Sequence, residues 1–111
     1  MTRRKYEPHP VEARVRASIA AGLTMTGEPN VAIAEIVYVG DPMIGRRQRG
    51  LVPWSLADLG RLADHWRISP EALLIGPDQV LAELPAERVA ELRRARGLPA
   101  LPARDTGRAA A

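Results

Sequence analysis

Apolar side chains recur at every fourth position near the start of the chain, and this spacing predicts a first long helix. The apolar stripe would lie on a helix over residues 10–26 and contain Val11, Val15, Ile19 and Leu23. Gly22 should weaken this helix by about 1 kcal/mol relative to alanine. Gly27 is well placed to end it, because glycine readily adopts the left-handed conformation that closes many helices.

The central stretch predicts four shorter helices, at residues 30–36, 41–49, 56–67 and 70–74. Two of them have clear start signals: Ser55 with Asp58 resembles a capping box, and Ser69 precedes a first-turn proline. The third should turn one face to the core, which would carry Leu56, Leu59, Leu62, Ala63 and Trp66. Only residues 37–40 separate the first two. That arrangement is typical of a helix-turn-helix, whose second helix enters the DNA major groove.

The two ends of the chain are less regular. Two prolines keep residues 1–9 extended, as a flexible basic arm. Residues 78–84 and 86–96 can form short helices with narrow apolar faces. From residue 98 onward, apolar side chains no longer recur at a regular spacing. The sequence therefore predicts an all-α protein, with a compact five-helix domain at 10–76, a helical extension at 77–97 and a disordered tail at 98–111.

Composition excludes several classes of protein. The 111 residues include no cysteine and two histidines, so neither disulfides nor a metal site is expected. No apolar run approaches the ~20 residues that span a bilayer, and no nucleophile–base pair or glycine-rich phosphate loop occurs. We expect a cytoplasmic protein that is not an enzyme and binds no cofactor or membrane. The net charge is +3, and the excess of basic over acidic side chains falls in residues 1–54.

Several residues of the central stretch follow a family pattern. They include Ile33-Ala34-Glu35 in the first short helix, Val39-Gly40 in the turn, and Ile44, Arg46 and Gly50 in and after the second helix. The pattern continues through Trp54-Ser55-Leu56, Leu59, Leu62-Ala63 and the run from Ile68 to Leu74. On these residues the stretch 30–76 resembles the phage-repressor family of helix-turn-helix domains. The resemblance is to the lambda-repressor-like and Cro-like kind of actinobacterial phages and prophages.

This resemblance implies base-reading positions at the start of the second short helix and one turn further on. Those positions hold Asp41, Pro42 and Arg46. Arg46 is the best candidate, because a guanidinium binds guanine O6 and N7 in a bidentate manner. Asp41 could accept from a cytosine amino group or could serve only the helix dipole. Phosphate contacts are expected from Arg3, Arg4, Lys5, Arg47, Gln48 and Arg49, although a solvated charged face is the alternative for the helical arginines.

The other prominent residues are interpreted as structural. The predicted core contains Ile33, Ile44, Trp54, Leu59, Leu62 and Trp66. Trp54 is expected to plug the junction between the second short helix and the next one rather than to stack on a base. His9 and His65 have no partner at ligand spacing and are interpreted as incidental polar residues. Solvated helix charges are expected at Glu12, Glu28 and Glu35.

Three features depart from the family pattern. Tyr38 stands where the turn often has glycine, and a left-handed conformation costs other residues about 1–2 kcal/mol. Glu28 occupies a position that is usually apolar. The core-facing position near the end of the second short helix, usually Leu or Ile, holds Arg47 or Gln48. That helix is therefore expected to pack poorly or to be shifted by one residue.

These observations predict a sequence-specific regulator that represses transcription by occupying double-stranded operator DNA, in a temperate phage or prophage. Two alternatives stay open: an antitoxin-like module that binds a protein through residues 78–96, and a nonspecific architectural DNA binder. One helix-turn-helix covers about one half-site, so a homodimer is also expected. Its contact would use the apolar residues of 78–96, which are Val80, Leu81, Leu84, Val89 and Leu92. A chain ending at Gly76 should then still fold but bind weakly.

Overall fold

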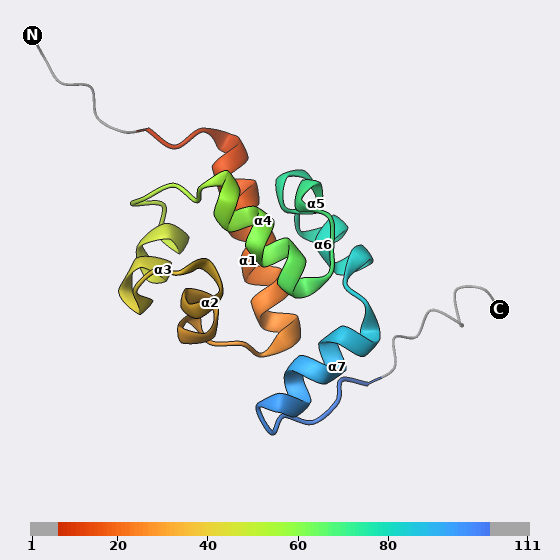
Figure 1. The fold of residues 1–111 in the computed structure, drawn as a ribbon. Coiled ribbons are helices and arrows are strands. Elements are labelled where there is room, and N and C mark those ends of the chain that lie inside the picture. The colour runs from red at the N-terminus through yellow and green to blue at the C-terminus, as the bar shows by residue number, and fades with distance from the viewer. Residues whose placement is uncertain (1–6, 103–111) are drawn as a thin grey trace, which may run out of the picture.

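The computed structural model describes residues 7–102, which form seven α-helices and no strand (Figure 1). In chain order these are α1 (Pro10–Thr26), α2 (Asn30–Val37), α3 (Asp41–Gln48), α4 (Leu56–Trp66), α5 (Pro70–Ile75), α6 (Pro77–Glu83) and α7 (Ala86–Ala95). Each coincides with a predicted helix, and no end lies more than one residue from its expected position. The all-α prediction is confirmed.

Helix α1 is the element around which the others pack. It lies along α5 and α6, and it also contacts α3 and α7. Helix α4 runs in front of α1 in the view of Figure 1. The apolar stripe predicted for α1 contributes Val15 and Ile19 to the core. Among the described residues, the largest fully buried apolar side chains are Ile19, Ile33, Ile44, Leu62, Trp66, Leu73 and Val80, and Leu59 is nearly as buried.

Gly22 of α1 lies directly against a side chain of α4. A β-carbon on this residue would lie 2.2 Å from the ring of Trp66, the largest fully buried side chain. Such a distance is impossible between packed atoms. The glycine therefore makes room for the indole, whereas the sequence suggested only its cost to the helix.

The predicted end signals of the helices are present. Gly27 closes α1 in the left-handed conformation, with φ at 72°. The Ser55 hydroxyl accepts from the Asp58 N–H and the Asp58 carboxylate accepts from the Ser55 N–H, so the capping box of α4 is confirmed. The Ser69 hydroxyl caps α5 by accepting from the Ala72 N–H.

The prediction that Leu56 faces the core from α4 is wrong. Leu56 is 80% exposed, and its neighbours Ser55 and Ala57 are exposed too. The first positions of α4 thus extend beyond the packed interior, which the helix reaches from Asp58 onward.

The apolar residues of the C-terminal helices are buried within the chain. Val80 is fully buried, Leu84 and Val89 nearly so, and Leu81 and Leu92 pack partly against the same core. Helix α6 lies along α1, and α7 also contacts α1. Most of this apolar surface therefore packs on the domain itself, and the homodimer expected through residues 78–96 stays a prediction.

Residues 98–102 are also part of the described fold. The Leu98 N–H donates to the Arg93 carbonyl at 2.9 Å, and the Leu98 side chain lies against Gly27. The expectation of disorder from residue 98 is wrong for this segment, while the rest of the expected tail lies outside the described residues. Among residues 7–102, no helix has both the length and the apolar character needed to cross a membrane.

Candidate nucleic-acid interface

Helices α2 and α3 form a close pair joined by residues 38–40 (Figure 1). Tyr38 turns the chain in the left-handed conformation, with φ at 59° and ψ at 42°, and the Val39 N–H donates to the Ala34 carbonyl at 3.1 Å. The tyrosine thus occupies a conformation that favours glycine. Its side chain is 80% exposed, and the Arg61 guanidinium lies over the ring at 5.2 Å from the centroid.

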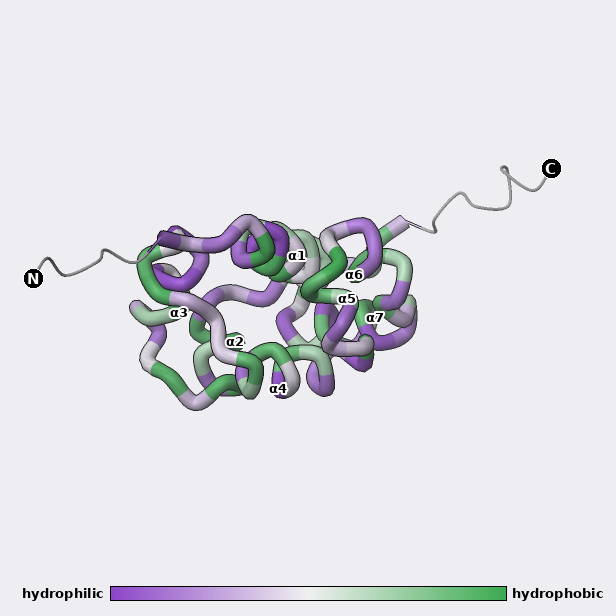
Figure 2. The backbone as a smooth tube through the Cα atoms, turned by 90° about the horizontal axis from the view of Figure 1, so that it is seen from above, coloured by the Kyte–Doolittle hydropathy of each residue, from purple (hydrophilic) through white to green (hydrophobic). Residues whose placement is uncertain are grey.

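The outward side of α3 carries the predicted base-reading residues. Asp41, Pro42 and Arg46 are exposed, as is Arg49 directly after the helix. Figure 2 shows α3 at one end of the molecule, on the far side of α2 from α7. Within residues 7–102, the side chains of Asp41, Arg46 and Arg49 have no hydrogen-bond or ion-pair partner. Their charges can therefore engage another molecule.

Arg47 points into the protein, not toward the outward side of α3 where a phosphate contact is predicted. Its guanidinium forms an ion pair with Asp58 of α4 and lies 5.3 Å from the centroid of the Trp54 ring. The Arg47 and Asp58 side chains are only 13% and 5% exposed. An arginine held in this way is neutralised inside the fold. At the core-facing position of α3, a buried ion pair therefore replaces the aliphatic contact of the family pattern.

Gln48 also points inward, not toward the outward side of α3 where a phosphate contact is predicted. Its Nε2 donates to the Arg16 carbonyl of α1 at 3.0 Å, and its Oε1 accepts from Trp54 Nε1 at 3.0 Å. Trp54 itself is partly buried and packs against the core between these polar groups. Polar contacts therefore join α3 to both α1 and α4.

The sequence contains a signal for this arrangement. The sequence predicts only a capping role for Asp58. Its carboxylate also pairs with Arg47, and the Arg61 guanidinium lies 3.7 Å from it. A basic residue at a core-facing position of one helix, followed by an acidic residue in the first turn of the next, indicates an ion pair across the connection. Ile33 and Ile44 provide the apolar part of the same packing.

A second buried polar cluster surrounds Glu28, which was expected to be solvated. This residue is 6% exposed and lies just before α2. Its Oε1 accepts from Trp66 Nε1 at 2.8 Å, and its Oε2 is 2.6 Å from His65 Nε2. Burial by itself raises the pKa of Glu28, but hydrogen bonds from His65, Trp66 and Thr26 outweigh burial and lower the pKa below its ordinary value.

His65 is therefore not an incidental residue. Its ring contacts the Glu28 carboxylate, and its backbone carbonyl accepts a 2.8 Å hydrogen bond from Nε of Arg88 on α7. Arg67 and Arg88 both approach Oε1 of Glu91 on α7, at 3.1 and 3.7 Å. The cluster joins the start of α2, the end of α4 and α7, three parts of the chain that are far apart in sequence.

The other three residues with expected incidental or solvated side chains do not all behave alike. His9 caps α1: its Nδ1 accepts from the Val11 N–H at 3.1 Å, and the Glu12 carboxylate accepts from the His9 N–H at 2.8 Å. The histidine and glutamate thus form a capping box that the sequence analysis missed. Glu35 is exposed on α2. The expected phosphate-contacting arm at Arg3, Arg4 and Lys5 lies outside the described residues.

No protein-family description, curated protein or solved structure matches this chain. Its function is therefore inferred from its own residues and geometry.

Proposed function

We propose that this chain is a sequence-specific DNA-binding regulator, with a helix-turn-helix of the phage-repressor type formed by α2 and α3. The observation that carries the proposal is the division of α3 into two sides. Ile44, Arg47 and Gln48 hold it to the protein, while Arg46 and the residues at its start face outward. A helix fixed in this way can enter a major groove without rearrangement.

The outward residues suit the two tasks of a DNA contact. Arg46 lies one turn into α3, where a guanidinium can reach guanine O6 and N7. Asp41 and Pro42 would face the bases at the start of the helix, and Arg49 would contact phosphate. Bound to an operator, such a domain represses transcription by keeping polymerase from the promoter.

Selection of binding sites from a random DNA pool, followed by gel-shift titration, tests this function. The wild type should enrich a short motif. Arg46→Ala should cost about 1–3 kcal/mol on that motif and relax the preference at one position. Arg49→Ala should weaken all sequences alike and lower the salt slope by about one. Failure to enrich any sequence, with equal losses for both variants, would contradict specific reading and favour an architectural binder.

A protein-interaction role is a second candidate, favoured by one feature of the C-terminal helices. An apolar pocket of about 290 Å³ lies beside α6 and α7, and its walls include Met25, Leu81, Val89 and Leu101. A homodimer or another protein could use this surface. Light scattering on the full chain distinguishes these cases, because a monomer in the absence of DNA excludes a stable homodimer.

A further inference from the structure

The last turn of α7 is fixed against the connection between α1 and α2. The Arg93 Nη1 donates to the Met25 carbonyl near the end of α1 at 3.3 Å, and the Arg93 Nε donates to the Pro99 carbonyl at 2.8 Å. Leu98 packs on Gly27, the residue that closes α1. In Figure 1 the end of α7 accordingly lies below the connection that leads into α2.

This arrangement brings Arg96 beside α2. A groove of about 280 Å³ separates α2 from α7. Helix α2 lines it with Ala32, Glu35 and Ile36, and the other side is lined by Leu92 and Ala95 of α7 and by Arg96 directly after it. Glu28 and His65, already bonded to each other, lie in the same groove. Arg96 is exposed, and its side chain has no hydrogen-bond or ion-pair partner in the part of the chain that the structure describes.

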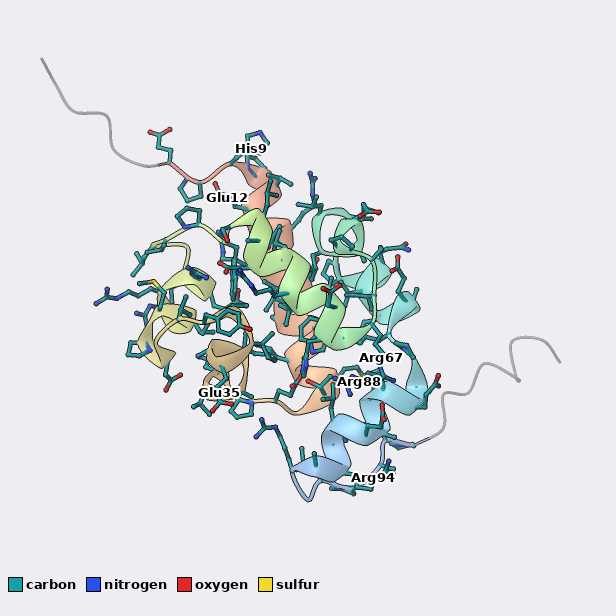
Figure 3. All side chains as sticks on the ribbon, in the orientation of Figure 1. His9, Glu12, Glu35, Arg67, Arg88 and Arg94 are labelled. Carbon is teal, nitrogen blue, oxygen red and sulfur yellow. The ribbon has the colours of Figure 1, made fainter. Side chains whose placement is uncertain are left out.

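Arg94 is a natural comparison for Arg96. It is also exposed and without such a partner among residues 7–102, but it lies two positions earlier, about 200° around the helix. Figure 3 shows Glu35 on α2 and Arg94 on the side of α7 that faces away from it. The two arginines therefore carry the same charge at nearly the same height of α7 but face different surroundings.

We infer that Arg96 is a DNA-phosphate contact, so that the end of α7 extends the DNA-binding surface of the α2–α3 pair. The inference rests on the proposed function: when the second helix of the pair lies in the major groove, the first crosses the sugar-phosphate backbone. A guanidinium held next to that first helix is then close to the backbone. Arg93 supplies the rigidity, since it anchors the turn to α1.

The charges around the groove sharpen this inference. Residues 92–102 contain three arginines and no acidic residue, so this end of α7 attracts an anionic polymer. Glu35, on the α2 side of the groove, has the opposite sign and would repel a phosphate that passes above it. Removal of Arg96 and removal of the Glu35 charge should therefore shift DNA affinity in opposite directions.

Fluorescence anisotropy with the full chain and a labelled duplex of arbitrary sequence tests the contact, because phosphate contacts do not depend on sequence. Titrations between about 50 and about 200 mM salt give the salt slope for the wild type, Arg96→Ala, Arg96→Lys, Arg94→Ala and Glu35→Gln. Arg96→Ala should lower the slope by about one and reduce affinity at low salt several-fold. Arg96→Lys should restore most of the slope, Arg94→Ala should leave it unchanged, and Glu35→Gln should strengthen binding.

Two results would overturn the inference. Equal losses for Arg96→Ala and Arg94→Ala would indicate a general effect of net charge, and an unchanged slope for Arg96→Ala would show that phosphate does not reach this side chain. In either case, a loss of affinity by Arg46→Ala would leave the proposed function standing. If the wild type binds no duplex, the proposed function fails as well. A thermal melt of each variant shows whether it is folded.

Discussion

The indole Nε1 of Trp66 donates a 2.8 Å hydrogen bond to the carboxylate of Glu28, although the two residues are 38 positions apart and both are buried. The other oxygen of the same carboxylate lies 2.6 Å from His65 Nε2. An ionised group in such surroundings is tolerated only because both of its oxygens are bonded. The bond joins the connection before α2 to the end of α4, so a buried charge stabilises the orientation of the helix pair that we propose binds DNA.

Replacing Glu28 should change how stability depends on pH. Because the pKa of Glu28 is lowered in the fold, its stabilisation is fully present above the ordinary carboxyl pKa and is lost as pH falls through the folded pKa. Glu28→Gln should therefore cost about 1–3 kcal/mol near neutral pH and much less in acid. Urea titrations of the wild type and the variant from about pH 7 to about pH 3 measure this difference.

A control separates Glu28 from other carboxylates. Hydrogen bonds from Gln79 and Ser69 also lower the pKa of Glu83, so the wild type loses further stability in the same range. The difference between wild type and Glu28→Gln removes that contribution. Glu35→Gln, an exposed substitution, should parallel the wild type throughout. Parallel curves for Glu28→Gln would contradict the role assigned to its carboxylate.

Two glycines should respond oppositely to alanine. In α1, Gly22→Ala gains helix propensity but forces a methyl group into the Trp66 ring, 2.2 Å away, so we expect a net loss of about 1–3 kcal/mol. In α4, a β-carbon on Gly60 would meet no atom within 4 Å, so Gly60→Ala should stabilise by up to about 1 kcal/mol. Thermal melts of the two variants decide the matter. A more stable Gly22→Ala would mean that Trp66 can move aside.

The buried ion pair should be costly to break from either end. Arg47→Met or Asp58→Asn leaves the partner charge without its counterpart at a buried site, at about 3–5 kcal/mol. Arg61→Ala is the matched control, because it removes a cation 3.7 Å from the same carboxylate. The Arg61 side chain is 45% exposed, so the loss of stability should stay below about 1 kcal/mol. Denaturant titrations of the single and double variants give the coupling energy, and additive losses for Arg47 and Asp58 would refute the pairing.

A chain that ends at Gly76 should not fold stably. It would lack Val80, which is fully buried, together with Leu84 and Val89, and would expose the side of α1 that α6 covers. Loss of several buried aliphatic side chains exceeds the stability of a typical domain of this size. Circular dichroism of this truncation and of a chain ending at Pro102 makes the comparison. A helical truncation with a cooperative melt would contradict the packing described above.

The helices could be predicted from the sequence because their determinants are local. Caps such as Ser55 with Asp58, and apolar spacing such as that of α1, act within a few residues. Fold class followed from the same signals. The side chains that position the candidate interface were harder to predict, because their partners are distant: Gln48 bonds the carbonyl of Arg16, 32 positions away, and Arg93 that of Met25, 68 positions away.

Residue type also misled the prediction of exposure. The resemblance predicts phosphate contacts for Arg47 and Gln48, although one of them stands at a core-facing position. Glu28 is expected to be solvated, because charged side chains are mostly exposed. Each is instead bonded inside the fold. Arg46 and Asp41, of similar chemistry, are exposed as expected. Only the orientation of α3 against α1 and α4 separates the two groups, and a single sequence does not encode that orientation locally.

The carboxylate of Asp58 belongs to two structures at once, since it caps the first turn of α4 and holds α3 through Arg47. Opening of that turn would release the arginine, and departure of the arginine would loosen the turn. The backbone amides at the start of α4 and those of α3 should then exchange with solvent deuterium as one local unfolding unit. The helix proposed to read DNA is in this sense only as rigid as the first turn of its neighbour.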